Sequence, residues 1–231
     1  MTTLYKLTDA DGYTQRGQRG ETLWTAGEWI VVAWGGALCE RGCLHAYADP
    51  LLAVLLDPVH AGLLPTGRLW VAEGYVRAED ATKVGCDRLR VMREHDVPEV
   101  TITQRVRWAI YCASEGYNEP SWQRWAAGWL DGTDRAASSC SAADAAATYD
   151  TYAAYAAAAA YDAAFTAARA ATYATYDTYA AYAAAATSAA DAAFTAAARA
   201  ATYANAASRA AANANNIDLL RLALQAITEE P

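Results

Sequence analysis

The stretch HAYADPLLAVLLDPVHA, residues 45–61, decides the expected fold of the first half of the chain. The side chain of Asp49 can accept a hydrogen bond from the first turn of a helix, and Pro50 suits the first helical position. Residues 51–56 are all aliphatic, so such a helix has no polar face. Pro58 lacks a backbone N–H and disfavours continuation. We therefore expect a short, buried helix that ends at Asp57.

Around this helix the sequence predicts strands and further helices in mixed order. Residues 4–15 are typical of a β-hairpin, because alternating residues flank Asp9-Ala10-Asp11-Gly12. Three further strands are predicted at 27–34, 68–76 and 85–92, and two helices at 103–114 and 121–130. No regular βαβ rhythm is present, so the predicted fold class is α+β, with a small mixed domain over residues 1–134.

The composition changes near residue 135. All eight tryptophans, all 14 glycines and all three histidines precede it, whereas more than half of residues 136–214 are alanine. Alanine has the highest helix propensity, and no glycine or proline interrupts residues 133–230. The sequence therefore predicts that residues 135–231 form an all-α hairpin or bundle of Ala/Tyr-rich helices, with an amphipathic helix at 217–227.

This alanine-rich segment contains an internal repeat. TYDTYAAYAAAAAYDAAFTAARAATYA spans residues 148–174, and a copy three residues longer spans 175–204. Separate helices are favoured, because one helix of roughly 100 residues would be about 150 Å long. Alanine buries little apolar area, so such helices need extensive close contacts. We therefore expect a homo-oligomer.

Tyrosines recur every third residue in both copies. Such a row wraps around a helix and does not form the stripe of a coiled coil. The rings could surround an alanine-lined contact, or they could stack against a planar ligand. These candidate ligand-binding residues are Tyr149, Tyr152, Tyr155, Tyr173, Tyr176, Tyr179 and Tyr182.

Two groups of polar residues are candidates for chemistry. Cys39, Cys43 and His45 lie within seven residues, but a structural zinc site needs a fourth ligand and a recognisable pair spacing, so we expect no metal. No cofactor motif is present, so no cofactor is expected. His45, His60 and Glu73 are the candidate acids or bases; they could equally satisfy backbone carbonyls or face solvent.

Charge and hydropathy exclude some classes of partner. With 26 acidic and 18 basic residues the net charge is −8, which disfavours nucleic-acid binding and a polybasic membrane anchor. No apolar stretch suggests a membrane span or a secretory signal. Five cysteines at irregular spacing indicate free thiols in a reducing compartment. We expect a cytoplasmic protein.

Four segments carry a resemblance to known proteins. LYKLTDADGYT, HAYADPLLAVLLDPVHA, RLWVAEGYV and KVGCDRLRVMRE, followed by the alanine-rich tail, resemble a group of uncharacterised bacteriophage and actinobacterial proteins over roughly residues 4–130. The resemblance implies a phage origin and brings no activity, cofactor or catalytic residue.

Three functions follow as hypotheses. The leading one is a non-enzymatic phage-type interaction protein that binds a host protein or a small ligand, such as a nucleotide signal, in counter-defence, and oligomerises through its helices. An enzyme with a site near His45, His60 and Glu73 is the second. A structural array that resembles helical antifreeze proteins is the third, prompted by Thr148, Thr151, Thr166, Thr172, Thr175 and Thr178.

Overall fold

The computed structural model describes residues 1–38, 41–80, 82–115, 120–136, 139 and 218–229. The chain divides into two compact units, residues 1–99 and residues 100–231, and each is described by itself. The domain boundary predicted after residue 134 stays a prediction, because most of residues 135–231 lie outside the described residues.

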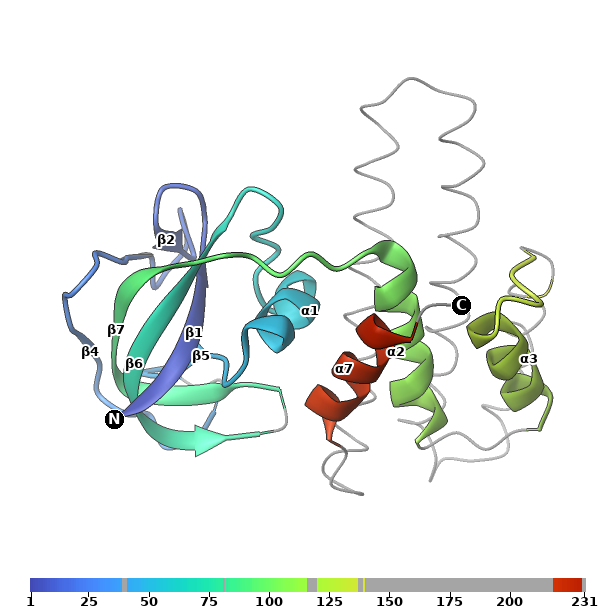
Figure 1. The fold of residues 1–231 in the computed structure, drawn as a ribbon. Coiled ribbons are helices and arrows are strands. Elements are labelled where there is room, and N and C mark those ends of the chain that lie inside the picture. Colours follow the sequence, from blue (N-terminus) through green and yellow to red (C-terminus); the bar gives the residue numbers. More distant parts are fainter. Residues whose placement is uncertain (39–40, 81, 116–119, 137–138, 140–217, 230–231) are drawn as a thin grey trace. The chain divides into compact units, whose positions relative to one another are not determined.

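Residues 1–99 are built around an antiparallel sheet (Figure 1). Its longest strands are β6 (Arg68–Glu79) and β7 (Val84–His95), which form a hairpin. β1 (Thr2–Thr8) pairs with the free side of β6. β4 (Ile30–Val31) and β5 (Leu44–Ala46) both pair with β7, at different points along its length.

The sheet curls until its two sides meet. Tyr47 follows β5 directly and exchanges two backbone hydrogen bonds of 2.8 Å with Tyr5 in β1. β1 therefore has partners on both sides, β6 on one and the end of β5 on the other. Register shifts in the β6–β7 ladder bend the two strands, as a small barrel-like sheet requires.

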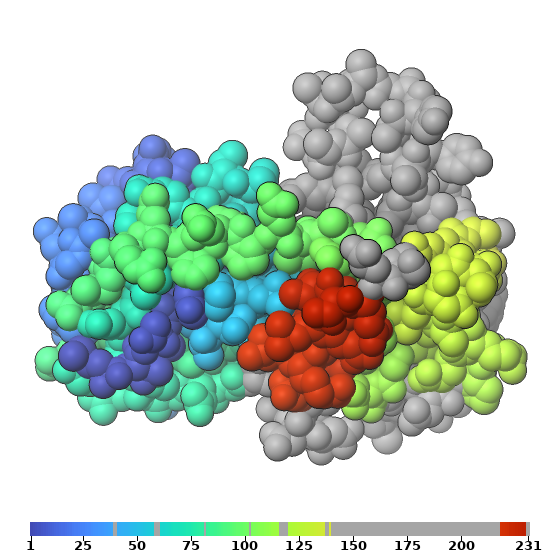
Figure 2. Space-filling model, in the orientation of Figure 1, coloured from blue at the N-terminus to red at the C-terminus, as the bar shows by residue number. Residues whose placement is uncertain are grey.

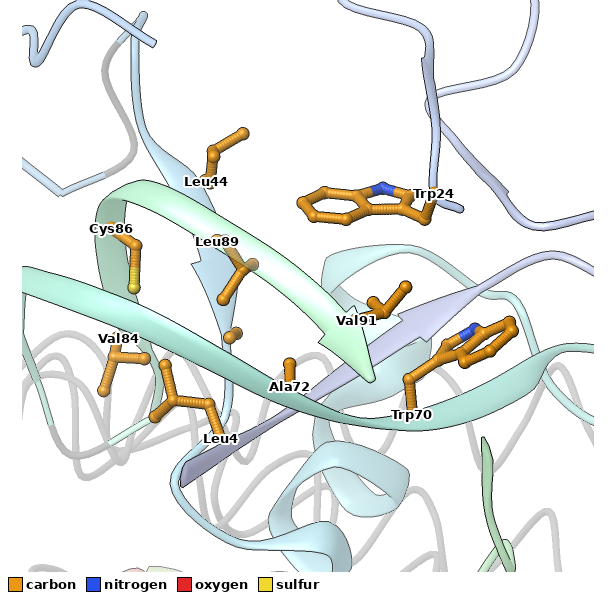
Figure 3. Close-up of a cluster of buried hydrophobic side chains, with 10 residues drawn as sticks. Leu4, Trp24, Leu44, Trp70, Ala72, Val84, Cys86, Leu89 and Val91 are labelled. Atoms are coloured by element: carbon orange, nitrogen blue, oxygen red, sulfur yellow. The ribbon is translucent and has the colours of Figure 1, made fainter. Parts of the chain in front are cut away.

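The side chains inside the curl form the core of residues 1–99, and Figure 3 shows them converging from β1, β5, β6 and β7. Trp24 enters this core from outside the sheet, because it directly follows the short ribbon of β2 (Tyr13–Thr14) and β3 (Thr22–Leu23). The buried cluster comprises Leu4, Trp24, Leu44, Ala46, Trp70, Ala72, Val84, Cys86, Leu89 and Val91.

The hairpin predicted over residues 4–15 is wrong in its pairing. The turn is present, since Asp9 Oδ1 accepts hydrogen bonds from the backbone of Asp11 and Tyr13 at 3.0 and 2.7 Å. However, β1 forms its ladder with β6, and β2 pairs with β3. The long strand β6 offers β1 seven paired positions, far more than the two residues of β2 could provide.

The buried helix is confirmed as α1 (Pro50–His60). Asp49 caps it by accepting a 2.8 Å hydrogen bond from the backbone N–H of Leu51, and residues 51–56 are all buried. The helix ends at His60 and not at Asp57. Pro58 lies in the last turn, where the backbone carbonyl of Asp57 still accepts hydrogen bonds from residues 61 and 62.

The described part of residues 100–231 is helical. α2 (Ile102–Ser114) begins with a capping box between Thr101 and Gln104. α7 (Leu219–Thr228) packs against α2, as the red and green helices in Figures 1 and 2 show. α3 (Pro120–Leu130) also contacts α2 and buries three tryptophans, Trp122, Trp125 and Trp129.

The predicted fold class is therefore wrong. The described part of residues 1–99 is mostly antiparallel β-sheet with the single helix α1, and the two helices that suggested a mixed domain belong to the second unit. The strands β6 and β7 are each 12 residues long, because their polar outer positions continue the ladder beyond the predicted apolar runs. No all-α hairpin is seen among the described residues, and the alanine repeats lie outside them.

Candidate functional site

β1 carries a lysine into the interior of the sheet. Side chains alternate between the two faces of a strand, so Lys6 shares a face with Leu4 and Thr8. All three residues are buried, and Lys6 is only 9% exposed. An ammonium group thus lies beside the apolar core of residues 1–99.

The surroundings of Lys6 hold the amine in place without neutralising it. Nζ donates a 2.7 Å hydrogen bond to the backbone oxygen of His45 and lies 4.9 Å from the centre of the Trp24 ring. The ring is itself fixed, because Trp24 Nε1 donates to Thr14 Oγ1 at 2.9 Å. Within the part of the chain that the structure describes, no carboxylate forms an ion pair with Lys6.

This environment changes the acidity of the amine. Burial lowers the pKa of Lys6 from 10.5 to about 8, since water no longer solvates the ammonium form. Electrostatic interactions with Cys86 and Cys43 oppose the shift without cancelling it. At pH 7 roughly a tenth of the Lys6 side chains are therefore neutral amines with a free lone pair.

A cavity of about 590 Å³ opens beside this amine. We call it the Lys6 cavity. Its walls come from β1, the β2–β3 ribbon, the residues around β5, the segment after α1 and the turn before β7. Its lining includes Lys6, Thr14, Arg16, Trp24, His45 and Lys83.

The lining of the Lys6 cavity is cationic. Among the described residues none of its lining side chains is acidic, whereas Lys6, Lys83 and Arg16 are basic. Arg16 is partly neutralised by Asp11 at 2.5 Å and Asp9 at 3.5 Å. In a chain with a net charge of −8, this is a local reversal of sign. Such a lining favours an anion.

Lys83 lies in a tight turn that directly precedes β7. Asp80 Oδ1 accepts hydrogen bonds from the backbone of Thr82 and Lys83 at 2.8 and 3.0 Å, and from Thr82 Oγ1 at 2.5 Å. Burial raises the pKa of Asp80, but these hydrogen bonds and Lys83 outweigh it, so the pKa is lowered overall. The carboxylate therefore stays ionised and keeps the turn fixed.

The two lysines of the cavity are also the only lysines of the sequence. Of 18 lysines and arginines, Lys6 and Lys83 alone are lysines. All other basic positions are arginine, which stays protonated at any pH a protein meets. Among the lysine and arginine side chains, those that can lose a proton are thus confined to this one cavity.

Only some of the candidate residues predicted from the sequence line the Lys6 cavity. His45 and Cys43 line it, whereas Cys39 lies outside the described residues. In the described part of the chain, no three His, Cys, Asp or Glu residues come together as metal ligands. His60 is the last residue of α1, and its side chain is not among those described.

Glu73 is separated from His45. It lies in β6 between the buried core positions Ala72 and Gly74, so its side chain points to the other face. There its Oε2 accepts hydrogen bonds from Arg90 at 2.7 and 3.1 Å. Glu73 does not line the Lys6 cavity, and the structure does not bring it together with His45.

Lys6 and Lys83 are not among the candidate residues predicted from the sequence. The usable signal was the scarcity of lysine, together with a charged residue at an inward position of a strand. The seven candidate tyrosines between 149 and 182 lie outside the described residues.

One further observation concerns membranes: in the described residues, no helix combines the length and the apolarity that a transmembrane segment needs. Comparisons of this chain with protein-family models, with curated proteins and with solved structures find no match.

Proposed function

We propose that residues 1–99 form a non-catalytic binding module whose Lys6 cavity takes a small anionic molecule. One observation carries this proposal: Lys6 is a buried ammonium group with no carboxylate partner among the described residues. Buried charges in folded proteins are normally paired, because an unpaired charge loses its solvation without compensation. An anion in the cavity supplies the missing partner.

The dimensions and charge of the cavity narrow the ligand class. A volume of about 590 Å³ lies within the range of small-molecule sites. Lys6 and Lys83 both line the cavity, and lysine is a common phosphate ligand. We therefore favour a phosphorylated small molecule of mononucleotide size over a monocarboxylate.

Binding of an anion is coupled to proton uptake at Lys6. The pKa of Lys6 is about 8 without a ligand, and a neighbouring negative charge raises it again. Near pH 8 about half of the amines are neutral, so each binding event takes up a fraction of a proton from the buffer. This fraction falls at pH 6.5, where the amine is already protonated.

The resemblance to phage proteins extends the proposal to a biological setting. In an infected cell, a cytoplasmic module of this kind would withdraw a phosphorylated signal molecule from the host. Sequestration needs tight binding without turnover, and the separation of Glu73 from the cavity is consistent with a site that lacks an acid–base pair of His45 and Glu73.

Isothermal titration of the full chain tests the proposal. Mononucleotides and inorganic phosphate are titrated at pH 8 in two buffers of different ionisation enthalpy, with the uncharged nucleosides as matched ligands. We expect at least one phosphorylated compound to bind with proton uptake and the nucleosides to bind at least tenfold more weakly.

A pair of variants connects this binding to the cavity. Lys6→Met keeps the length and apolar volume of the side chain and removes its charge, and we expect it to weaken binding at least tenfold. Arg93→Met removes a charge from an exposed position of β7 and should leave affinity within twofold. Absence of binding by every anion, or equal loss in both variants, would overturn the proposal. Near-ultraviolet circular dichroism checks that both variants are folded.

A further inference from the structure

A second property of the Lys6 cavity concerns its amines. The sequence holds two lysine side chains, and both line this cavity. Attraction for an anion alone does not require lysine, because arginine binds phosphate at least as well. Arginine is the basic residue used elsewhere in the chain. What lysine adds is an amine that can lose a proton and act as a nucleophile.

The two lysines differ in their surroundings. Lys6 lies on β1 between the buried residues Leu4 and Thr8, and its Nζ faces the Trp24 ring. This apolar setting depresses the pKa of Lys6 to about 8, as in lysines that react with carbonyl compounds. Lys83 is also buried, but it directly precedes β7, in a turn fixed by the Asp80 carboxylate. Lys6 is therefore the nucleophile in the fraction of chains in which it is neutral. In those chains Lys83 holds the anionic group, whereas the ammonium form of Lys6 pairs with the anion directly.

We propose that Nζ of Lys6 condenses reversibly with the aldehyde or ketone group of an anionic ligand held in the Lys6 cavity. This inference rests on the anion binding proposed above and specifies a second functional group of the ligand. It makes the cavity a trap for phosphorylated carbonyl compounds, held by one covalent bond and one ionic contact.

The reaction needs no oxidant or cofactor. The lone pair of the neutral amine attacks the carbonyl carbon, a C–N bond forms, and the electron pair of the C=O π bond moves to oxygen. Two protons pass from nitrogen to that oxygen, which leaves as water while the C=N bond forms. Hydrolysis reverses each step and frees both the ligand and Lys6.

The scarcity of lysine makes the test selective. The full chain is incubated with pyridoxal 5′-phosphate, used only as an aldehyde that carries a phosphate, and the imine is reduced with borohydride. Mass spectrometry of peptides then locates the label, which adds the mass of the aldehyde less one oxygen atom. The competing amines are Lys83 and the α-amino group of Met1. We expect Lys6 to react at least tenfold faster than either in the folded chain, and this preference to vanish in urea.

Two controls separate this inference from the proposed function. Pyridoxine 5′-phosphate carries the same phosphate but an alcohol in place of the aldehyde, so its binding by calorimetry reports on the anion site alone. If it binds while Lys6 remains unlabelled, the imine proposal fails and the anion proposal stands. If it does not bind and no label enters, both fail. Labelling spread equally over Lys6, Lys83 and Met1 also overturns the imine proposal.

Variants complete the experiment. Lys6→Met should lose the label altogether and not transfer it to Lys83. Lys83→Met should still label Lys6, but only at an aldehyde concentration at least several-fold higher, because the phosphate has lost one cation. Unchanged labelling of Lys6 in this variant would remove Lys83 from the site.

Discussion

Buried polar groups are distributed very unequally between residues 1–99 and the described helices of residues 100–231. Of the seven buried polar or charged residues in the described chain, six belong to residues 1–99, and Arg107 alone belongs to the helices. The helices bury tryptophan, leucine and alanine instead. Polar groups of equal size stabilise a core less than apolar ones. This concentration in residues 1–99 is consistent with the anion site proposed for that unit.

The six polar residues do not have the same role. Thr8 Oγ1 accepts a 3.0 Å hydrogen bond from Trp70 Nε1, and Asp87 forms an ion pair of 2.6 Å with Arg77. Asp57 accepts two backbone hydrogen bonds, so these three are bound into the fold. Lys6 differs from these three residues, because no carboxylate in the described part of the chain forms an ion pair with it. The comparison predicts that structural polar residues stabilise the unit and that Lys6 destabilises it.

The largest effect is expected at Asp57. Its fully buried carboxylate accepts hydrogen bonds from the backbone N–H groups of Leu63 and Leu64 at 3.1 and 2.9 Å. Asp57→Ala deprives a buried donor, Leu64, and a part-buried donor, Leu63, of this partner and should lower the free energy of unfolding by about 4 kcal/mol. Urea unfolding measures this. Asp57→Asn keeps one acceptor and should lose about half as much. A loss below about 1 kcal/mol for the alanine variant would contradict a structural role.

The next effect is a pH dependence due to Lys6. The unfolded chain holds this proton up to pH 10.5, whereas the folded chain releases it near pH 8. Between these values the unfolded state binds more protons, so the stability of the folded state rises with pH. The penalty present below pH 8 amounts to at most about 3 kcal/mol and is relieved by pH 10.5. Lys6→Met should lack this rise.

The difference in unfolding free energy between wild type and Lys6→Met separates the pH dependence due to Lys6 from that of other titrating groups. Burial raises the pKa of the Cys86 thiol to about 11, which makes folded stability fall between pH 9 and 11 in both proteins. Urea unfolding at pH 7, 8, 9 and 10 should therefore show two curves that converge as the pH rises. Parallel curves would show that the ammonium group of Lys6 is solvated or paired.

The smallest expected effect is the loss of a helix N-cap, and it should be equal in both units. Asp49 caps α1 and Thr101 caps α2, the first through a 2.8 Å hydrogen bond and the second through a capping box. Asp49→Ala and Thr101→Ala should each lower the free energy of unfolding by about 1 kcal/mol. Thermal unfolding followed by circular dichroism provides the measurement. If one substitution lowered the free energy of unfolding several times more than the other, the two units would also differ in how much a helix cap stabilises them.

The sequence predicted what depends on neighbours along the chain. The cap at Asp49, the buried face of residues 51–56 and the strands of the β6–β7 hairpin all follow from adjacent residues. The partner of β1 could not be inferred, since β6 and β2 compete for it and only the finished sheet decides. The same holds for Lys6 and Lys83, which are 77 positions apart in sequence and line one cavity. Glu73 was selected for its apolar neighbours, but alternation along β6 turns it to the other face.

The pairing of β1 with β6 also affects the order of folding. Thr2 pairs with Gly74 and Thr8 with Arg68, so β1 remains without its main partner until residues 68–74 have been synthesised. A waiting strand of this kind can be captured by strands of other chains. A solvated, fully charged Lys6 in the middle of TTLYKLT opposes such capture during synthesis. Lys6, which we expect to destabilise the folded sheet, is thus also expected to limit aggregation of the nascent chain.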